Sequence, residues 1–341
     1  MKRVNLIPEL AETTPEEFCQ NIVTARAPVV LREFVKHWQL VSLRDSADDF
    51  SRRLQQEDSG EKFYTVVGSP DIKGRFFYGD GLQGTNFNKT NATISDALAH
   101  IAQQSSAASP HAIAVQAARV ATALPNIAKS HTNPLLPDID PTLWLSNQSM
   151  VAAHFDLHDN IACVVHGRRR FTLFPPEQIA NLYIGPTLNA PGGVPISIVD
   201  LNKPDLEKYP RFQDALDAAL YADLEPGDAI FIPTPWWHAV ESKDPLNMLI
   251  NYWWSAQVQP LVAANKSLMH SMLSIGNLPI EQRRAWKDFF DYLVFRQELD
   301  PTEHLPAELH DVVTSLSPEQ EQQVMDYLST KTSSPKISDP Q

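Results

Sequence analysis

The clearest indication of the fold is the stretch NIACVVHGRRRFTLFPP, residues 160–176. Its two halves, 160–167 and 168–176, are short runs rich in β-branched and aromatic residues, and they meet at Gly167. Short runs of this composition, interrupted by a glycine, are typical of consecutive β-strands. The stretch therefore predicts two strands at the centre of the chain.

Similar runs recur on both sides of this stretch, from LWLSNQ (143–148) to INYWW (250–254), between Gly, Pro and Asn turns. The turn EPGD (225–228) leads into another strand, which stops at Pro233 because proline cannot take part in a central ladder. Many short strands at this spacing predict a β-sandwich or β-barrel. Residues 177–223 read as an insertion with a turn-rich part and a helix near its end.

The flanks of this β region carry helical and mixed patterns. Thr14, followed by Pro15 and Glu17, predicts a helix start with a capping box. The remaining N-terminal patterns predict a buried strand at 27–35, helices at 45–57 and 93–106 and short strands at 62–68 and 74–80, with 111–120 open between strand and helix. After residue 256 the pattern is amphipathic and helical, and Ser317 begins a second capping box.

These patterns predict one mainly β core with flanking helices rather than two independent domains. We expect four regions: N-terminal helices and strands at 1–110, the barrel at 111–256 with its insertion at 177–223, C-terminal helices at 257–330 and a disordered polar tail at 331–341.

Composition limits the classes of function. The chain has 341 residues and a formal net charge of −13, which disfavours a general nucleic-acid binder and would suit a basic protein or peptide partner. Cys19 and Cys163 are far apart in apolar settings, so no disulfide framework is implied. The N-terminus lacks an apolar signal region and no apolar run approaches the roughly 20 residues that span a bilayer. We expect a cytoplasmic protein with no membrane association.

The stretch AHFDLHDN, residues 153–160, is the first candidate metal site. Residues two apart in a strand share a face, so His154 and Asp156 point the same way and Asp159 points away. His158 lies about 13 Å from His154 at roughly 3.3 Å per residue, too far for one ion to bind both. Geometry nominates His154 and Asp156, although such a pair also fits an ordinary polar strand.

A third ligand is offered by GDAIFIPTPWWHAVES, residues 227–242, in which a strand and a proline-rich turn are followed by His238. A single histidine among aromatic residues is often only packed in a core. Two histidines and one carboxylate from two strands of a small barrel, however, form the facial triad of non-haem Fe(II) oxygenases.

An open Fe(II) site needs an electron source, and the usual one, 2-oxoglutarate, has a far carboxylate that requires a cation. Strand alternation places Arg169 with Phe171 and Leu173 on one face, and Arg168 with Arg170 on the other. Arginine is well suited to bind a carboxylate with two hydrogen bonds. The alternation alone does not say which face is inward.

Four stretches together resemble the cupin-like JmjC family of Fe(II)- and 2-oxoglutarate-dependent hydroxylases, which includes a protein asparaginyl hydroxylase. They are AHFDLHDNIACVVHGRRRFTLFPP, DLNKPDLEKYPRFQ, EPGDAIFIPTPWWHAVES and NMLINYWW, and the clear match runs from about 143 to 254. The resemblance implies a double-stranded β-helix, the cupin or jelly-roll core. It also implies Fe(II) held by His154, Asp156 and His238.

The resemblance further implies a binding site for 2-oxoglutarate. Arg169 stands where the family usually has a lysine for the far carboxylate, and Asn160, Asn251 and Trp253 match residues beside the co-substrate. Two further positions depart from the family pattern: a threonine is replaced by Val151, and a tyrosine by Ala114. These departures leave the identity and affinity of the oxoacid open.

The expected function is therefore that of a dioxygenase, which uses Fe(II), 2-oxoglutarate and dioxygen to hydroxylate an aliphatic carbon of a protein, RNA or small-molecule substrate. The acidic charge favours a protein, a peptide or a small molecule over nucleic acid. The alternative is a non-catalytic metal-binding cupin that acts as a ligand sensor or interaction module, and a third reading is another metalloenzyme on the same barrel. The resemblance also implies a homodimer formed through the C-terminal helices, where 283–295 carries an apolar stripe, although such a stripe is more often intramolecular core than an interface.

Overall fold

A computed structural model describes residues 5–187, 190–255, 262–296, 299–306 and 317–329. Two β-sheets form its centre, one of nine strands and one of five. In spatial order, the larger sheet contains β1 (Glu9–Leu10), β2 (Val29–Leu31), β12 (Ala229–Ile232), β9 (Asp159–His166), β14 (Asn247–Trp254), β7 (Thr142–Ser146), β6 (Ala112–Arg119), β3 (Phe63–Gly68) and β5 (Phe87–Ala92). The smaller sheet contains β11 (Leu220–Leu224), β10 (Arg169–Phe174), β13 (Trp237–Ser242), β8 (Ser149–His154) and β4 (Arg75–Phe76).

The two central strands at 160–176 are confirmed as β9 and β10, but they do not pair with each other. β9 lies in the larger sheet and β10 in the smaller one, so the chain crosses between the sheets at Gly167. Gly167 has a φ of +72°, and a Cβ atom there would lie 2.4 Å from Oδ1 of Asn247. Only glycine fits this crossing without strain.

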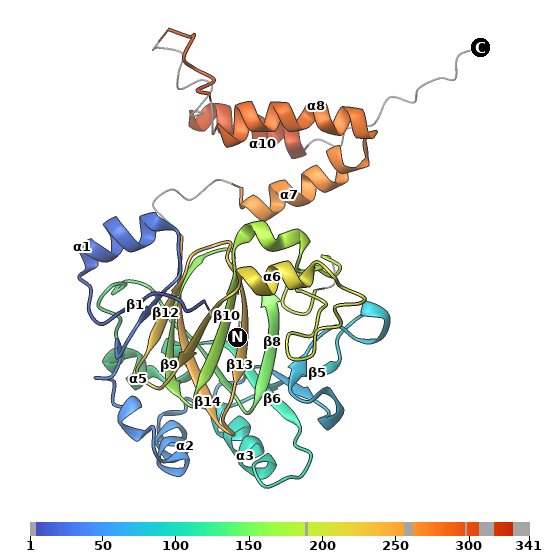
Figure 1. Ribbon diagram of the computed structural model, residues 1–341. Coiled ribbons are helices and arrows are strands. Elements are labelled where there is room, and N and C mark those ends of the chain that lie inside the picture. Colours follow the sequence, from blue (N-terminus) through green and yellow to red (C-terminus); the bar gives the residue numbers. More distant parts are fainter. Residues whose placement is uncertain (1–4, 188–189, 256–261, 297–298, 307–316, 330–341) are drawn as a thin grey trace. The chain divides into compact units, whose positions relative to one another are not determined.

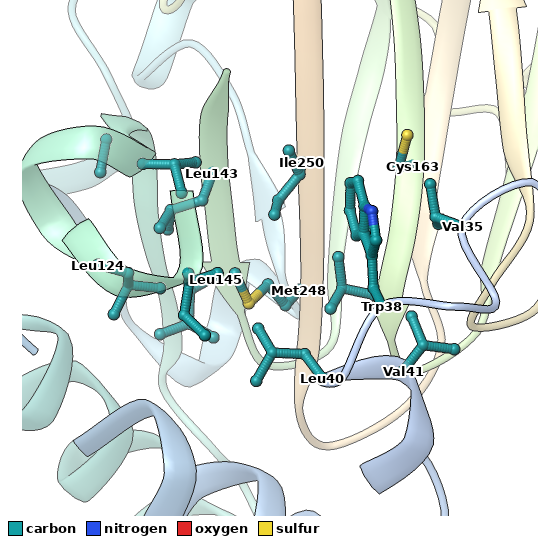
Figure 2. Close-up of a cluster of buried hydrophobic side chains, with 14 of the residues drawn as sticks. Val35, Trp38, Leu40, Val41, Leu124, Leu143, Leu145, Cys163, Met248 and Ile250 are labelled. Carbon is teal, nitrogen blue, oxygen red and sulfur yellow. The ribbon is translucent and has the colours of Figure 1, made fainter. Parts of the chain in front are cut away.

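Strand β9 is buried on both faces, which explains its continuous apolar sequence. One face of the strand, with Ala162 and Val164, packs against Phe171 and Leu173 of the opposite sheet and forms the interior of the barrel. The other face, with Cys163, packs against the N-terminal segment around Trp38, as Figure 2 shows. The barrel is therefore packed inside and covered outside on this sheet.

Helices and short helical turns flank the sheets, and α2 and α3 lie together below the sheets in Figure 1. In the first part of the chain these are α1 (Pro15–Glu17), η1 (Phe18–Val23), η2 (Val41–Leu43), α2 (Ala47–Glu57), η3 (Pro70–Ile72), η4 (Asp80–Leu82), α3 (Ile94–Gln104), α4 (Val120–Ala123), α5 (Pro125–Ser130), η5 (Pro176–Ala180) and α6 (Phe212–Ala218). The capping box predicted at Thr14 is present, and Thr93 forms another at the start of α3.

Two strands are shorter than the sequence predicts, and one segment that the sequence left open is a strand. The strand expected at 27–35 is only β2, because Glu33 has a φ of +53° and its amide donates to Asp228, which turns the chain away. The strand expected at 74–80 is the two-residue β4. The ambiguous segment 111–120 is a strand, β6, with a bulge between Val115 and Ala118.

Residues 1–259 form one compact unit and residues 260–341 a second. The second unit contains α7 (Ala264–Leu273), η6 (Ile275–Asn277), α8 (Ile280–Phe290), η7 (Asp291–Phe295) and α10 (Pro318–Ser329). Its capping box at Ser317 is formed with Gln320. The apolar stripe expected along 283–295 is exposed in large part, with Phe289 at 57%. No helix among the described residues is long and apolar enough to cross a membrane.

Candidate metal centre

His154 and His238 face each other on neighbouring strands of the smaller sheet. They are register partners on β8 and β13, and their ring centroids are 4.2 Å apart. Asp156 lies close to both, with its Oδ2 3.7 Å from Nε2 of His238. Each of the three residues offers a ligand atom within 4.8 Å of the others, so together they can hold one metal ion.

The position of Asp156 differs from the one that strand alternation predicts. Strand β8 ends at His154, and Asp156 lies in the short loop 155–158 before β9, which bends at Leu157 and His158. His154 and Asp156 therefore do not lie on one strand, as the alternation assumed. Their side chains nevertheless come within reach of one ion.

Both histidines are held in the form that binds metal through Nε2. Nδ1 of His154 lies 2.9 Å from the carbonyl of Ala152, and Nδ1 of His238 lies 3.2 Å from the carbonyl of Trp236. A carbonyl oxygen only accepts, so each Nδ1 carries the hydrogen and each Nε2 keeps its lone pair. Burial, reinforced by the neighbouring His154, lowers the pKa of His238 well below its usual value and keeps this ring neutral at neutral pH.

The Asp156 carboxylate is oriented by a chain of donors. Its Oδ2 accepts from Nε1 of Trp253 at 3.0 Å and from Nδ2 of Asn160 at 3.3 Å. Asn160 in turn accepts from Nδ2 of Asn251 at 3.0 Å. Trp253, which the resemblance implies beside the co-substrate, thus also makes a polar contact with Asp156. Trp253 is the register partner of Asn160 on the neighbouring strand, and no local sequence pattern shows this pairing.

The three residues lie in a cavity of about 460 Å³. Most of its lining is apolar and includes Phe76, Phe87, Trp144, Phe155, Leu157 and Ile196. Asp156 and Arg169 are the acidic and basic side chains among the lining residues, apart from histidines. Val151 also lines the cavity, whereas Ala114 is not among the lining residues and is buried with Phe76 and Phe87.

The structure decides which of the three arginines is inward. Arg168 pairs with Asp244 at 2.7 Å and Arg170 with Asp223 at 2.6 Å, both at the surface. Arg169 is 5% exposed, and its Nε and Nη2 make no hydrogen bond with the described residues. Burial lowers the pKa of Arg169 to about 10, so the guanidinium is charged at neutral pH.

A buried cation without a partner is costly, and most buried polar groups in proteins have one. Arg169 lines the same cavity as the His–Asp–His group. The arrangement therefore suits a ligand that places a negative charge against the guanidinium.

His158 and Asp159 lie outside the group of three. His158 contacts the hydroxyl of Ser255, with 3.0 Å between Nδ1 and Oγ. Asp159 is buried and binds Arg26 through both of its carboxylate oxygens. Arg26 was not a candidate from the sequence, because no local pattern connects it with a residue 133 positions away.

Residues 15–259 match the family model of the cupin-like domain, so the chain belongs to the cupin-like domain family. This membership and the two facing sheets define a double-stranded β-helix core of the JmjC-like cupin type.

The chain is similar to three curated proteins over part of its length. It is 36% identical over 114 residues to lysine-specific demethylase JMJ31 of Arabidopsis thaliana, and the aligned region covers 33% of the chain and 20% of that protein. It is 32% identical over 161 residues to human HSPB1-associated protein 1, covering 43% and 30%. It is 36% identical over 101 residues to chicken tRNA wybutosine-synthesizing protein 5, covering 30% and 29%. The matches thus span less than a third of each relative.

Proposed function

We propose that this protein is an Fe(II)- and 2-oxoglutarate-dependent dioxygenase that hydroxylates an aliphatic carbon. The observation that carries the proposal is the buried Arg169, whose Nε and Nη2 make no hydrogen bond with the described residues, in the same cavity as His154, Asp156 and His238. A metal group alone is common to many cupin-type sites. A buried cation beside it calls for a second, anionic ligand, which a dicarboxylic oxoacid supplies.

The donor set fits Fe(II). Two imidazoles whose Nδ1 atoms face backbone carbonyls, and one carboxylate, form the donor set of a facial triad, which leaves positions open for further ligands. In this proposal His154, Asp156 and His238 hold the iron. Bound Fe(II), together with 2-oxoglutarate and dioxygen, supplies the oxidising chemistry of this enzyme class.

The surrounding residues have separate tasks in the proposed reaction. Arg169 binds the far carboxylate of the co-substrate with its fork of donors, in place of the usual lysine. Trp253 and Asn160 keep the Asp156 carboxylate in one orientation, and Asn251 holds Asn160. The apolar lining limits the access of water to the metal.

The same lining bears on the primary substrate. Asp156 and Arg169 are both engaged in the proposed reaction, and His158, the other ionisable side chain left among the described lining residues, already contacts Ser255. We therefore propose that the group presented to the metal is uncharged. The described lining residues also include no cluster of lysines and arginines for a phosphate backbone, which favours a protein, peptide or small molecule over RNA.

A second candidate is a cupin that binds metal and an anion without turnover. The observation in its favour is Val151, which lines the cavity where the family has a threonine and offers no hydrogen bond to a co-substrate. An oxoacid held by Arg169 with fewer partners would sit more loosely and react less readily.

Two measurements on the iron-loaded protein separate these candidates. Titration with 2-oxoglutarate without oxygen is expected to produce the metal-to-ligand absorption band, and addition of oxygen is expected to yield succinate. Asp156→Ala should abolish both, because it removes a metal ligand. Succinate formation by Asp156→Ala at the wild-type rate would refute the assignment. A band without any succinate would support the second candidate.

A further inference from the structure

The loop that carries Asp156 and the loop that leads to His238 are joined outside the cavity by an N-terminal residue, Arg26. Arg26 follows η1 and has a φ of +50°. Its two terminal nitrogens each donate to one oxygen of Asp159, both at 2.8 Å. Nη2 also donates to the carbonyl of Thr234 at 2.6 Å. One guanidinium thus binds two segments that are far apart in the sequence.

Asp159 and Thr234 connect this contact to the metal-binding loop. The Thr234 amide donates to Oδ1 of Asp159 at 2.9 Å, and the Thr234 hydroxyl donates to the carbonyl of Asp156 at 2.5 Å. Asp159 is three residues after Asp156, and Thr234 is four residues before His238. Two hydrogen bonds of Thr234 therefore link the segment that carries Asp156 to the loop that leads to His238.

Arg26 makes one further contact through its backbone. Its carbonyl accepts from Nε1 of Trp236 at 3.0 Å, and the carbonyl of Trp236 is the group that accepts from Nδ1 of His238. Earlier in the same segment, Phe18 packs against Phe231 with ring centroids 5.4 Å apart. The N-terminal segment is thus fixed to strand β12, and Arg26 is held over the loop that follows this strand.

We infer that Arg26 and Asp159 are positioning residues that set the separation of Asp156 from His238 and so the metal affinity of the site. The inference rests on the proposed metal centre but not on its dioxygenase activity. Metal–ligand bonds are about 2 Å long and tolerate little displacement of a ligand. A bidentate pair with a buried carboxylate is rigid, and loss of the arginine leaves that carboxylate unpaired.

The test is Co(II) binding to the metal-free full-length protein. Calorimetry measures the affinity, and the visible spectrum of the bound ion reports its coordination. Arg26→Gln is expected to weaken binding about tenfold or more, the scale seen when groups that orient metal ligands are removed, and to change the spectrum. Arg26→Lys should restore part of the affinity. Arg168→Gln is the matched control, because it breaks a bidentate pair with Asp244 that contacts neither segment, and it should leave affinity and spectrum unchanged.

A second variant guards against a general loss of stability in Arg26→Gln. Thr234→Val removes the hydroxyl that donates to Asp156 but keeps the shape, and it should also weaken Co(II) binding and change the spectrum. Lower thermal stability of the metal-free variants with unchanged affinity and spectrum would show a merely structural role and overturn the inference. Absence of Co(II) binding by the wild-type protein would overturn the metal centre itself, and the inference with it.

Discussion

The indole Nε1–H of Trp253 donates to Oδ2 of Asp156 across 3.0 Å, so an aromatic wall of the cavity also orients a carboxylate of the proposed metal site. The indole is itself fixed by an edge contact with Trp144, whose ring centroid lies 6.0 Å away. A carboxylate held by donors on its sides presents its remaining lone pairs in one direction. The bond connects strand β14 to the loop after β8.

Replacement of Trp253 by phenylalanine keeps an aromatic wall but removes this donor. We expect Trp253→Phe to weaken metal binding about tenfold, because groups that orient metal ligands contribute on this scale. Calorimetry with Co(II) on the metal-free protein measures the effect. Trp254→Phe is the control, since Trp254 stacks on Phe231 and is not among the cavity-lining residues. Equal affinities of the two variants would contradict the role of the indole N–H.

Removal of the buried cation should change stability and co-substrate binding in opposite directions. Arg169→Met relieves the cost of an unpartnered buried charge, so we expect the ligand-free protein to gain about 1–3 kcal/mol in free energy of unfolding. The same variant should lose most of its affinity for 2-oxoglutarate, because the far carboxylate loses its partner.

Denaturant unfolding and calorimetry measure these two effects. The control ligand is 2-oxobutyrate, which lacks the far carboxylate and should bind the wild-type protein and Arg169→Met equally. A weaker binding of both oxoacids by the variant would mean that Arg169 acts on the metal end of the ligand instead.

His131 should make the protein sensitive to mild acid. Its Nε2 accepts from the Leu40 amide at 3.2 Å, and burial lowers the pKa of His131 from 6.5 to about 4. The unfolded chain therefore takes up a proton between pH 6.5 and pH 4 that the folded protein does not. Stability from this group is complete above pH 6.5 and is lost as the pH falls toward 4.

The variant His131→Gln keeps an acceptor for the Leu40 amide but cannot be protonated in this range. We expect its free energy of unfolding to fall less steeply between pH 6.5 and pH 4 than that of the wild-type protein. Denaturant unfolding at a series of pH values checks this. Parallel curves for the two proteins would show that His131 does not contribute.

Gly167→Ala should destabilise the crossing between the sheets by more than about 2 kcal/mol, because it combines a positive φ with a collision. The added Cβ would lie 2.4 Å from Oδ1 of Asn247 and 2.5 Å from the carbonyl of Leu246. Gly60→Ala separates the two causes, since Gly60 has a φ of +80° and nothing within 4 Å of the added atom. It should cost about 1 kcal/mol in thermal or denaturant unfolding. A similar cost at both positions would argue against the collision.

Much of the fold could be predicted from the sequence because strands carry local signals. The apolar runs of β9 and β10 and the capping boxes depend on neighbouring residues, and both are present in the structure. The pairing of strands was not accessible, because periodicity says nothing about the partner. For this reason the sequence did not show that β9 and β10 belong to opposite sheets.

The sequence predicted the residue types of the candidate site better than their geometry. Chemistry and order along the chain nominated His154, Asp156 and His238, but the strand argument for Asp156 missed the end of β8 at His154. Trp253 and Arg26 act through contacts with residues 97 and 133 positions away. No local pattern encodes such contacts, so their roles appear only once the chain is folded.

The three consecutive arginines make a wrong pairing register of β10 energetically unfavourable. Arg168 and Arg170 form ion pairs with acidic residues outside the barrel, whereas Nε and Nη2 of Arg169, inside it, have no hydrogen-bond partner in the part of the chain that the structure describes. A slip of one residue against its neighbours would exchange the two faces of the strand. Two guanidinium groups would then enter the apolar interior and lose their partners, while Phe171 and Leu173 would turn to solvent. A barrel with a shifted β10 would thus be less stable, and β10 is the strand that supplies Arg169, the proposed binding residue for the co-substrate carboxylate.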